Sequence, residues 1–337
     1  MTEHQWGFRT RALHAGGGPD PTTGARAVPI YQSTSFVFED TADAADLFAL
    51  QKYGTIYSRI SNPTTAAFEE RIASLEGGIG AVATASGQAA EFLTAAALAE
   101  NGDNLVASSS LYGGTHTMFD VTLGRFGIEA RFVDGDDPEA FAARIDDRTR
   151  FMYTEVIGNP SGAVADLAAL ADVAGAHGLP LVVDATFATP YLCRPMEHGA
   201  DIVLHSATKF IGGHGTSLGG VVCESGRFDW GQGRFAQMTE PNPGYNGLRF
   251  WENFGEYAFC TKLRAEQLRD IGASLSPFNA FMLLQGLETL PQRMDEHVAN
   301  AQKVAEFLDA HPQVSWVAYA GFPDSPYHEL AQRYLPK

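Results

Sequence analysis

Four segments of the sequence combine residue types that could carry out covalent chemistry or hold a flat, charged ligand. The most reactive is His205-Ser206-Ala207-Thr208-Lys209, in which two hydroxyl side chains precede a lysine. A lysine that leaves a buried strand can lose its proton and form a Schiff base with a carbonyl compound. The alternative is a surface lysine whose charged end stays in water. The hydroxyls and the glycines that follow, Gly212, Gly213 and Gly215, favour the chemical interpretation.

Three further segments could complete a binding site around that lysine. Asp184 closes the apolar run 181–183, and a carboxylate at the end of a buried strand is costly unless a cation or a donor meets it. Tyr112 lies beside two glycines and could stack on a flat ring. Segment 84–88 is predicted to turn from a strand into a helix, whose first amides could bind a phosphate near Gly87. Ordinary alternatives are a helix cap or structural ion pair for the aspartate, a turn aromatic for the tyrosine, and a tight turn for the last segment.

Together these segments meet the requirements of one cofactor. A lysine that forms an imine, a carboxylate for a pyridinium nitrogen, a stacking ring and a phosphate site are what pyridoxal 5'-phosphate (PLP) needs. The loose dinucleotide fingerprint at 78–83 fits less well, because it follows a predicted helix instead of a strand. His198, His205 and His214 lack the spacing of a metal site, so no metal is expected. The sequence therefore predicts a PLP site.

The elements that must position these residues alternate along the chain. A helix is predicted to begin at Asn62-Pro63 and to end at Gly77, because asparagine caps helices and proline tolerates the first turn. Apolar strands then alternate with helical patterns, which predicts a mostly parallel sheet with helices on both faces, and ligands at the carboxyl ends of its strands. Seven strands are predicted, at 81–85, 104–107, 129–133, 150–154, 180–184, 202–205 and 219–223.

Composition along the chain predicts three parts. Residues 14–35 are rich in Gly, Pro, Thr and Ser without periodicity, which indicates an extended arm. After Trp230 the composition changes, and long helical patterns follow at 257–272, 280–287 and 293–310. We therefore expect an N-terminal arm (1–62), a cofactor domain (63–255), and the start of a second domain (256–337).

Charge and composition exclude several classes of protein. Acidic residues number 40 and basic residues 23, a net charge of -17, which argues against a nucleic-acid-binding surface. No run approaches the 18 or so apolar residues of a membrane span, and the N-terminus lacks a signal-peptide pattern. The distant cysteines Cys193, Cys223 and Cys260 form neither a disulfide framework nor a paired zinc motif. We therefore expect a cytoplasmic protein in a reducing compartment.

At this point the motifs also resemble a known family. Segment 206–209 with Gly212-Gly213-His214 looks like the cofactor-lysine signature of the PLP-dependent trans-sulfuration enzymes of cysteine and methionine metabolism, and 57–64 looks like their arm motif. That family has the aspartate-aminotransferase-like fold (fold type I). The resemblance implies that the arm 1–62 contacts a partner subunit and that 256–337 is the start of an incomplete C-terminal α+β domain. Within it, segments 13–16, 22–31, 197–201 and 286–290 are most similar to the O-acetylhomoserine sulfhydrylases.

The resemblance implies a role for each candidate residue. Lys209 would bind the cofactor aldehyde and move protons, and Asp184 would pair with the pyridine nitrogen. Tyr112 would stack on the ring and assist leaving-group or amine chemistry. The phosphate would be bound by the amides of Gly87 and Gln88 and by the hydroxyls of Ser206 and Thr208. Tyr57 and Arg59 would reach the phosphate in the neighbouring subunit. Asn159 would lie near the ring hydroxyl, and Thr186 would be a further cofactor contact.

The sequence departs from the family pattern at two places. The usual Asp-Asn-Thr is here Asp184-Ala185-Thr186, which bears on the hydrogen bonds around the aspartate. The substrate-carboxylate arginine of the family lies in the later part of the second domain, beyond the point where this sequence stops. We therefore name no carboxylate ligand and expect the natural protein to continue past residue 337. The arginines considered and set aside are Arg264, Arg269, Arg293 and Arg333.

The implied reaction is a γ-replacement in methionine biosynthesis. O-Acetyl-L-homoserine and sulfide would give L-homocysteine and acetate. The enzyme would be a homotetramer built from dimers with shared active sites.

A methionine γ-lyase is an alternative, although such lyases carry cysteine where this chain has Gly114. A cystathionine γ-synthase, which uses cysteine as nucleophile, is another. An inactive PLP-binding scaffold is the alternative of a different class, and the intact Lys209 and Asp184 argue against it. The acyl group, acetyl or succinyl, stays open, as do the sulfur donor and the choice between dimer and tetramer.

Overall fold

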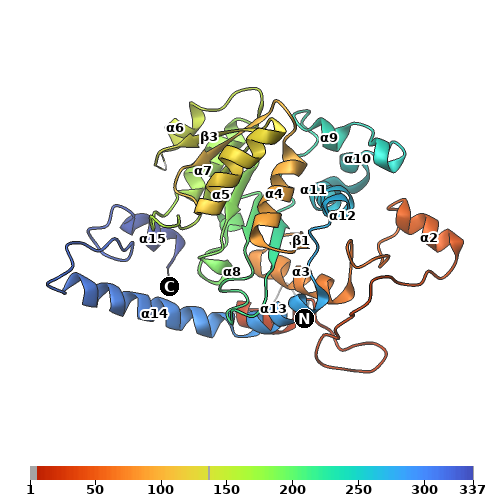
Figure 1. The fold of residues 1–337 in the computed structure, drawn as a ribbon, viewed down its shortest axis with the longest axis horizontal. Helices are drawn as coiled ribbons and strands as arrows, with labels where there is room; N and C mark the ends of the chain where they lie inside the picture. Colours follow the sequence, from red (N-terminus) through yellow and green to blue (C-terminus); the bar gives the residue numbers. More distant parts are fainter. Residues whose placement is uncertain (1–5, 136, 337) are drawn as a thin grey trace.

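A seven-stranded sheet forms the centre of the molecule in the computed structural model, which describes residues 6–135 and 137–336 (Figure 1). The strand order is β1-β7-β6-β5-β4-β2-β3. Strands β2 to β6 run parallel, and β7 is antiparallel to its neighbours β1 and β6. The predicted mostly parallel sheet is therefore confirmed. Its strands are β1 (Gly80–Thr84), β2 (Asn104–Ser108), β3 (Glu129–Val133), β4 (Thr149–Glu155), β5 (Leu181–Asp184), β6 (Ile202–His205) and β7 (Gly220–Glu224).

The helices that flank β1 show how local sequence sets their ends. Helix α3 (Pro63–Glu76) begins where the Asn62 side chain accepts the N–H of Thr64 at 3.0 Å. It ends at Gly77, whose φ of 80° is the left-handed conformation that favours glycine. Helix α4 (Gly87–Leu98) begins after Ser86, whose side chain accepts the N–H of Ala89. A side-chain cap therefore fixes where each of the two helices begins.

The other helices cover the sheet or extend from it. The segments before β7 are α1 (Phe8–His14), α2 (Thr41–Phe48), α5 (Gly113–Thr117), the π-helix η2 (Met118–Thr122), the 3-10 helix η3 (Leu123–Phe126), α6 (Pro138–Ala142), α7 (Leu167–Ala176), α8 (Thr189–Leu192) and η4 (Pro195–His198). Those after β7 are α9 (Ala236–Thr239), η5 (Pro243–Tyr245), α10 (Phe250–Phe254), η6 (Gly255–Tyr257), α11 (Ala258–Lys262), the π-helix η7 (Leu263–Leu268), α12 (Arg269–Ile271), α13 (Pro277–Glu288), α14 (Leu290–Asp309) and α15 (His328–Tyr334).

Two apolar layers hold the helices on opposite faces of the sheet. One layer contains Leu181 and Val183 of β5 with side chains of α3, α7 and α13. The other contains Val182 with side chains of α4, η2 and α11. Alternate residues of a strand point to opposite faces, so Asp184 belongs to the face that α4 covers.

The chain after residue 255 continues this core before it leaves the sheet. Leu263 lies in the α4-side layer, and Leu283 lies in the α3-side layer. Helix α14 then runs along the lower edge of the molecule toward α15 (Figure 1). Where we expected the start of an α+β domain, the described part of 256–337 contains helices and no strand. The division at residues 62 and 255 stays a prediction.

None of the helices in the described part of the chain combines the length and the apolar character that crossing a membrane requires.

Candidate active site

The predicted site residues lie mainly where parallel strands end. Asp184 is the last residue of β5 and pairs in register with Glu155, the last residue of β4. Ser206 directly follows β6, and Ser86 follows β1 by two residues. Because the carboxyl ends of parallel strands meet at one edge of a sheet, these segments form a single site.

The segment that carries Lys209 is a turn held by hydrogen bonds on both sides. The N–H of Lys209 donates to the carbonyl of Ser206 at 3.1 Å, and the N–H of Gly213 donates to the carbonyl of Lys209 at 2.8 Å. Thr208 Oγ1 accepts the N–H of Gly219 at 3.1 Å and lies 3.2 Å from its carbonyl. The backbone is thus fixed, while Lys209 itself is exposed.

The start of α4 packs directly against Ser206. A Cβ on Gly87 would lie 2.6 Å from the Cβ of Ser206 and 3.0 Å from its Cα, so a larger residue would separate the two segments. The first amides of a helix have no carbonyl partner within the helix and favour anions. The amides of Gly87 and Gln88 and the hydroxyl of Ser206 therefore form a cradle suited to a phosphate.

Asp184 is linked to the same cradle through Thr186. The N–H of Thr186 donates to Asp184 Oδ1 at 2.7 Å, and its Oγ1 accepts the N–H of Ser206 at 2.8 Å. Ala185, which stands where the family pattern has asparagine, is fully buried. Burial raises the pKa of Asp184, while the bonds from Thr186 and the nearby His205 act in the opposite direction.

A second strand-end carboxylate, Glu155, was not among the predicted residues. It accepts the N–H of Tyr112 at 2.6 Å and the N–H of Asn159 at 3.2 Å. Burial, and then the charge of Asp184, raises the pKa of Glu155 to about 8. The signal that pointed to Asp184, an acidic residue closing a buried strand, would also have identified Glu155.

A third carboxyl, Glu91 of α4, completes a buried acidic cluster with Asp184 and Glu155. Its side chain is 4% exposed, and Thr115 Oγ1 lies 3.0 Å from each of its oxygens. Burial and the charge of Asp184 raise the pKa of Glu91 well above its ordinary value. Such a cluster calls for a positive group beside Asp184, and the protonated nitrogen of a pyridine ring is one. The donor set at this strand edge therefore fits PLP.

Tyr112 is half exposed at the start of α5. Its ring covers Gly114 so closely that a Cβ on Gly114 would lie 2.5 Å from Tyr112 Cε1. The Glu155 carboxylate and the bare backbone of Gly114 thus define where this ring lies.

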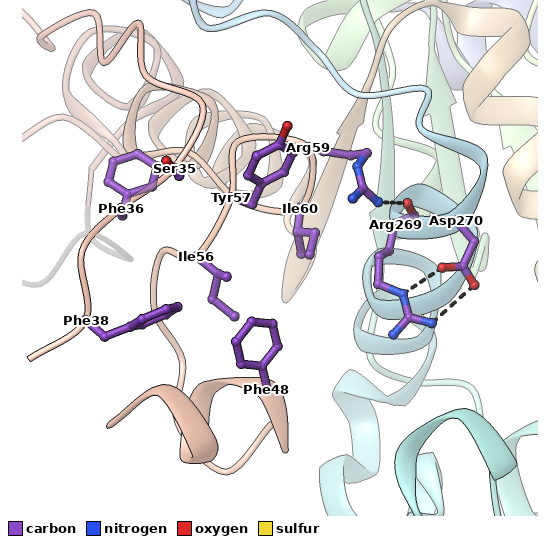
Figure 2. A pocket seen from close by; sticks show the side chains of 10 residues that line it. All are labelled: Ser35, Phe36, Phe38, Phe48, Ile56, Tyr57, Arg59, Ile60, Arg269 and Asp270. Atoms are coloured by element: carbon purple, nitrogen blue, oxygen red, sulfur yellow. Dashed lines mark hydrogen bonds and ion pairs between the residues drawn. The ribbon is translucent and has the colours of Figure 1, made fainter. Parts of the chain in front are cut away.

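Tyr57 and Arg59 lie in a separate pocket between the arm and α12 (Figure 2). Arg59 donates to the carbonyl of Arg269, and its guanidinium lies 5.4 Å from the centre of the Tyr57 ring. The pocket has a volume of about 560 Å³, and the described residues that line it include no other candidate from the sequence. The structure thus does not bring these two residues to the strand-edge cluster.

The arginines set aside as carboxylate ligands bind groups of the protein. Arg264 donates to Glu69 Oε2 at 2.7 Å, and Arg269 donates to Asp270 Oδ1 at 2.7 Å. Arg293 donates to two backbone carbonyls at 2.6 Å each, and Arg333 lies 3.6 Å from a carboxylate oxygen.

Known proteins are similar to this chain in sequence and in fold. Residues 9–337 match the family model of Cys/Met metabolism PLP-dependent enzymes. An O-acetyl-L-homoserine sulfhydrylase of Leptospira meyeri is 52% identical over 96% of this chain and 75% of its own length. A homocysteine synthase of Schizosaccharomyces pombe is 53% identical over 97% of this chain and 77% of its own. A Campylobacter jejuni crystal structure, described as an O-acetylhomoserine (thiol)-lyase with a pyridoxyl-lysine, has a TM-score of 0.95 and 40% identity, and it covers 98% of this chain and 82% of that one.

The fold and the strand-edge site define a PLP-dependent enzyme of fold type I. More narrowly, the chain belongs to the Cys/Met metabolism PLP-dependent enzymes, and its cofactor is PLP.

Proposed function

We propose that this protein catalyses γ-replacement on O-acetyl-L-homoserine, with sulfide as the nucleophile and L-homocysteine and acetate as products. Relatives that are 52% and 53% identical over nearly the whole chain bear the names O-acetyl-L-homoserine sulfhydrylase and homocysteine synthase. The observation that carries the proposal is the joining of Asp184, Ser206 and the start of α4 through Thr186 and Gly87, beside the Lys209 turn.

The proposal assigns the cofactor contacts to this cluster. The amides of Gly87 and Gln88 and the hydroxyls of Ser206 and Thr208 would hold the phosphate. Asp184 would face the pyridine nitrogen, with Thr186 orienting its carboxylate. Asn159 would lie near the ring hydroxyl, and Tyr112 would cover the ring.

The protein's own groups then direct the chemistry. When bound, PLP supplies an aldehyde that takes up amines and a ring that withdraws electrons from the substrate's α carbon. Lys209 Nζ removes the proton from that carbon as the general base. The negative charge of Asp184 keeps the proton on the pyridine nitrogen. A second proton must leave Cβ before acetate can depart from Cγ, and the Tyr112 hydroxyl assists that departure. Sulfide then forms the new bond at Cγ, and protons return to Cβ and Cα.

A product assay tests the proposal. Purified protein with PLP, O-acetyl-L-homoserine and sulfide should release homocysteine and acetate in equal amounts. The matched reactions replace acetyl by succinyl, or sulfide by cysteine, or omit the nucleophile. Preference for cysteine would indicate a cystathionine γ-synthase, and ammonia release without a nucleophile would indicate a γ-lyase. Failure of every mixture would contradict an enzymatic role.

We extend the proposal to an active site shared between two subunits of a homotetramer. The arm exposes Val37, Tyr53 and Phe48, with relative exposures of 99%, 77% and 59%, and a partner subunit would cover such side chains. Arg59 on this arm could then pair with the partner's cofactor phosphate through two parallel hydrogen bonds.

Mixing two inactive variants tests the shared site. In a dimer of Arg59→Ala and Lys209→Ala chains, one site holds intact Arg59 and intact Lys209, and the other lacks both. Co-refolding should restore activity that neither variant shows alone. Mixed dimers verified by mass that stay inactive would place Arg59 in its own subunit's site.

A cytoplasmic location is also part of the proposal. The cysteines Cys193, Cys223 and Cys260 are buried and free, a state typical of a reducing compartment.

A further inference from the structure

An ion pair between Glu69 of α3 and Arg264 of η7 has no role in the mechanism above. Arg264 Nη2 donates to Glu69 Oε2 at 2.7 Å, and the two side chains are largely buried, with 6% of Glu69 and 17% of Arg264 exposed. Burying a charge pair costs desolvation free energy, and the pair offsets this cost only where further hydrogen bonds satisfy both groups. The other partners of the pair therefore show what it holds together.

Those partners come from the sheet and from the arm. The N–H of Ala83 donates to Glu69 Oε1 at 2.7 Å. Arg264 Nη2 also donates to the carbonyl of Ala81 at 3.0 Å, so both members of the pair bind β1, the strand that leads into the phosphate cradle. Arg264 Nη1 donates to the carbonyl of Ile60 on the arm at 2.9 Å. The pair thus fastens the arm to a strand of the sheet.

Ile60 lies in the tight turn that carries Arg59. The N–H groups of Ile60 and Ser61 donate to the carbonyl of Tyr57 at 2.9 and 3.1 Å, which closes the turn. Arg59 is exposed at the arm pocket and donates to the carbonyl of Arg269 (Figure 2). Because Ile60 directly follows Arg59, the bond to the Ile60 carbonyl limits where the backbone of Arg59 can lie.

We propose that Glu69 and Arg264 are positioning residues that hold the Arg59 turn in place for the cofactor phosphate of the partner subunit. The inference rests on the shared active site given under the proposed function. A guanidinium pairs with a phosphate through two parallel hydrogen bonds, so its place and its angle must both be fixed. Glu69 and Arg264 themselves contact neither substrate nor cofactor. The pair therefore acts on the neighbouring site and not on the site of its own chain.

Two changes release the arm with little damage to the fold. Glu69→Gln combined with Arg264→Met removes both charges together and keeps an amide oxygen for the N–H of Ala83. Removing both members of a buried pair is far less costly than removing one, which leaves an uncompensated charge. Arg264→Lys is the milder change: it keeps a charge opposite Glu69, but an ammonium lacks the planar fork that reaches three acceptors.

A second ion pair of the same length supplies the matched control. Arg150 lies 2.7 Å from Asp103, and both side chains are mostly buried. Arg150 is the second residue of β4 and Asp103 directly precedes β2, so this pair lies at the opposite end of the strands from the candidate site. Asp103→Asn combined with Arg150→Met repeats the charge removal without touching the arm.

Mixed dimers show which chain's site depends on the pair. One chain carries Lys209→Ala, and two different affinity tags allow only mixed dimers to be purified. Borohydride reduction can then fix PLP covalently only in the site of the chain that keeps Lys209. In the shared-site arrangement, that site receives its arm from the Lys209→Ala chain. The PLP concentration that half-saturates the covalent label therefore reports one site with a known arm, independently of turnover.

The chain that carries the double change decides the result. With Glu69→Gln and Arg264→Met on the Lys209→Ala chain, the half-saturating PLP concentration should rise about tenfold, because the arm of the labelled site is loose. With the same change on the other chain, it should stay within about twofold of the unaltered mixed dimer. Arg264→Lys should show the same difference with a smaller rise, and it decides the test if the double variant does not refold. The control pair should have no effect from either chain.

Three results would overturn the proposal. They are no rise from either chain, a rise only from the chain that keeps Lys209, and an equal rise from both, since the pair would then act within its own site or on the fold as a whole. Arg59→Ala on the Lys209→Ala chain is the reference for the shared site. If it has no effect there, the shared site itself is wrong. A normal effect of Arg59→Ala without an effect of the pair refutes the role of the pair alone.

Discussion

The carboxyl group of Glu155 accepts the backbone N–H of Tyr112 at 2.6 Å. The same carboxyl group accepts the N–H of Asn159 at 3.2 Å. One side chain at the end of β4 therefore holds two loops, each of which carries a residue proposed to face the cofactor ring. Loss of the acceptor would free both loops at once.

Substitution of Glu155 should loosen these loops in a graded order. Glu155→Gln keeps one acceptor oxygen, and Glu155→Leu keeps none, so we expect the turnover number to fall by about tenfold and about one-hundredfold. Hydrogen exchange at 109–118 and 157–163 in the cofactor-free protein should accelerate in the same order. Glu224→Leu is the control: Glu224 is another buried glutamate that accepts a backbone N–H, but it pairs with Ile202, at the opposite end of β6. It should leave exchange in both segments unchanged. Unchanged exchange in Glu155→Leu would show that other contacts hold the loops.

The raised pKa of Glu155 also predicts a pH dependence of stability. The folded protein keeps this proton up to about pH 8, whereas the ordinary value for the unfolded chain is 4.5. The stability that this proton provides is fully present below pH 4.5 and is lost as the pH rises through 8. Between these values the cofactor-free wild type should lose about 1.4 kcal/mol per pH unit more than Glu155→Gln. Urea unfolding at several pH values measures this difference, and parallel curves would contradict it.

Gly87→Ala should weaken phosphate binding without unfolding the protein. The added Cβ would lie 2.6 Å from the Ser206 Cβ, so α4 and the Ser206 segment must move apart. We expect the PLP dissociation constant to rise by about ten- to one-hundredfold. Gly175→Ala in α7 is a suitable control, because nothing lies within 4 Å of its added Cβ. Equal PLP affinities for both variants would exclude Gly87 from the phosphate cradle.

Gly114→Ala should displace the Tyr112 ring. Its Cβ would lie 2.5 Å from Tyr112 Cε1, whereas an added Cβ on the neighbouring Gly113 meets nothing within 4 Å. The turnover number of Gly114→Ala should fall by about tenfold, and the visible circular dichroism of the bound cofactor should change. Gly113→Ala should resemble wild type in both measurements. The role of the ring position would be refuted if the two variants behaved alike.

Sequence reasoning succeeded where local chemistry decides structure. The start of α3 follows from Asn62 and Pro63, and its end follows from Gly77, because caps act over a few residues. The strands ending at Asp184 and His205 were recognised as short apolar runs that end in polar residues. The Lys209 segment, Asp184 and the start of α4 could therefore be predicted to lie at one edge of the sheet, while their roles toward the cofactor stay predictions.

Residues whose environment comes from distant segments were missed or left unplaced. Glu91 lies on the buried face of α4, and only the packing against Thr115 and Tyr153 reveals its partners. Arg59 depends on a contact with Arg269, 210 residues away. Helical patterns after residue 255 indicated a separate domain, but they did not show that Leu263 packs with the sheet. Such contacts follow from tertiary packing and have no local signal.

The position of covalent cofactor attachment shows whether Lys209 is the residue that binds PLP. The protein is loaded with PLP, reduced with borohydride, digested and mapped by mass spectrometry. We predict that the reduced pyridoxyl group is on Lys209 and that Lys209→Ala retains no attached group. Attachment at another lysine, such as the buried Lys262, or an unmodified Lys209 in an active enzyme, would contradict it.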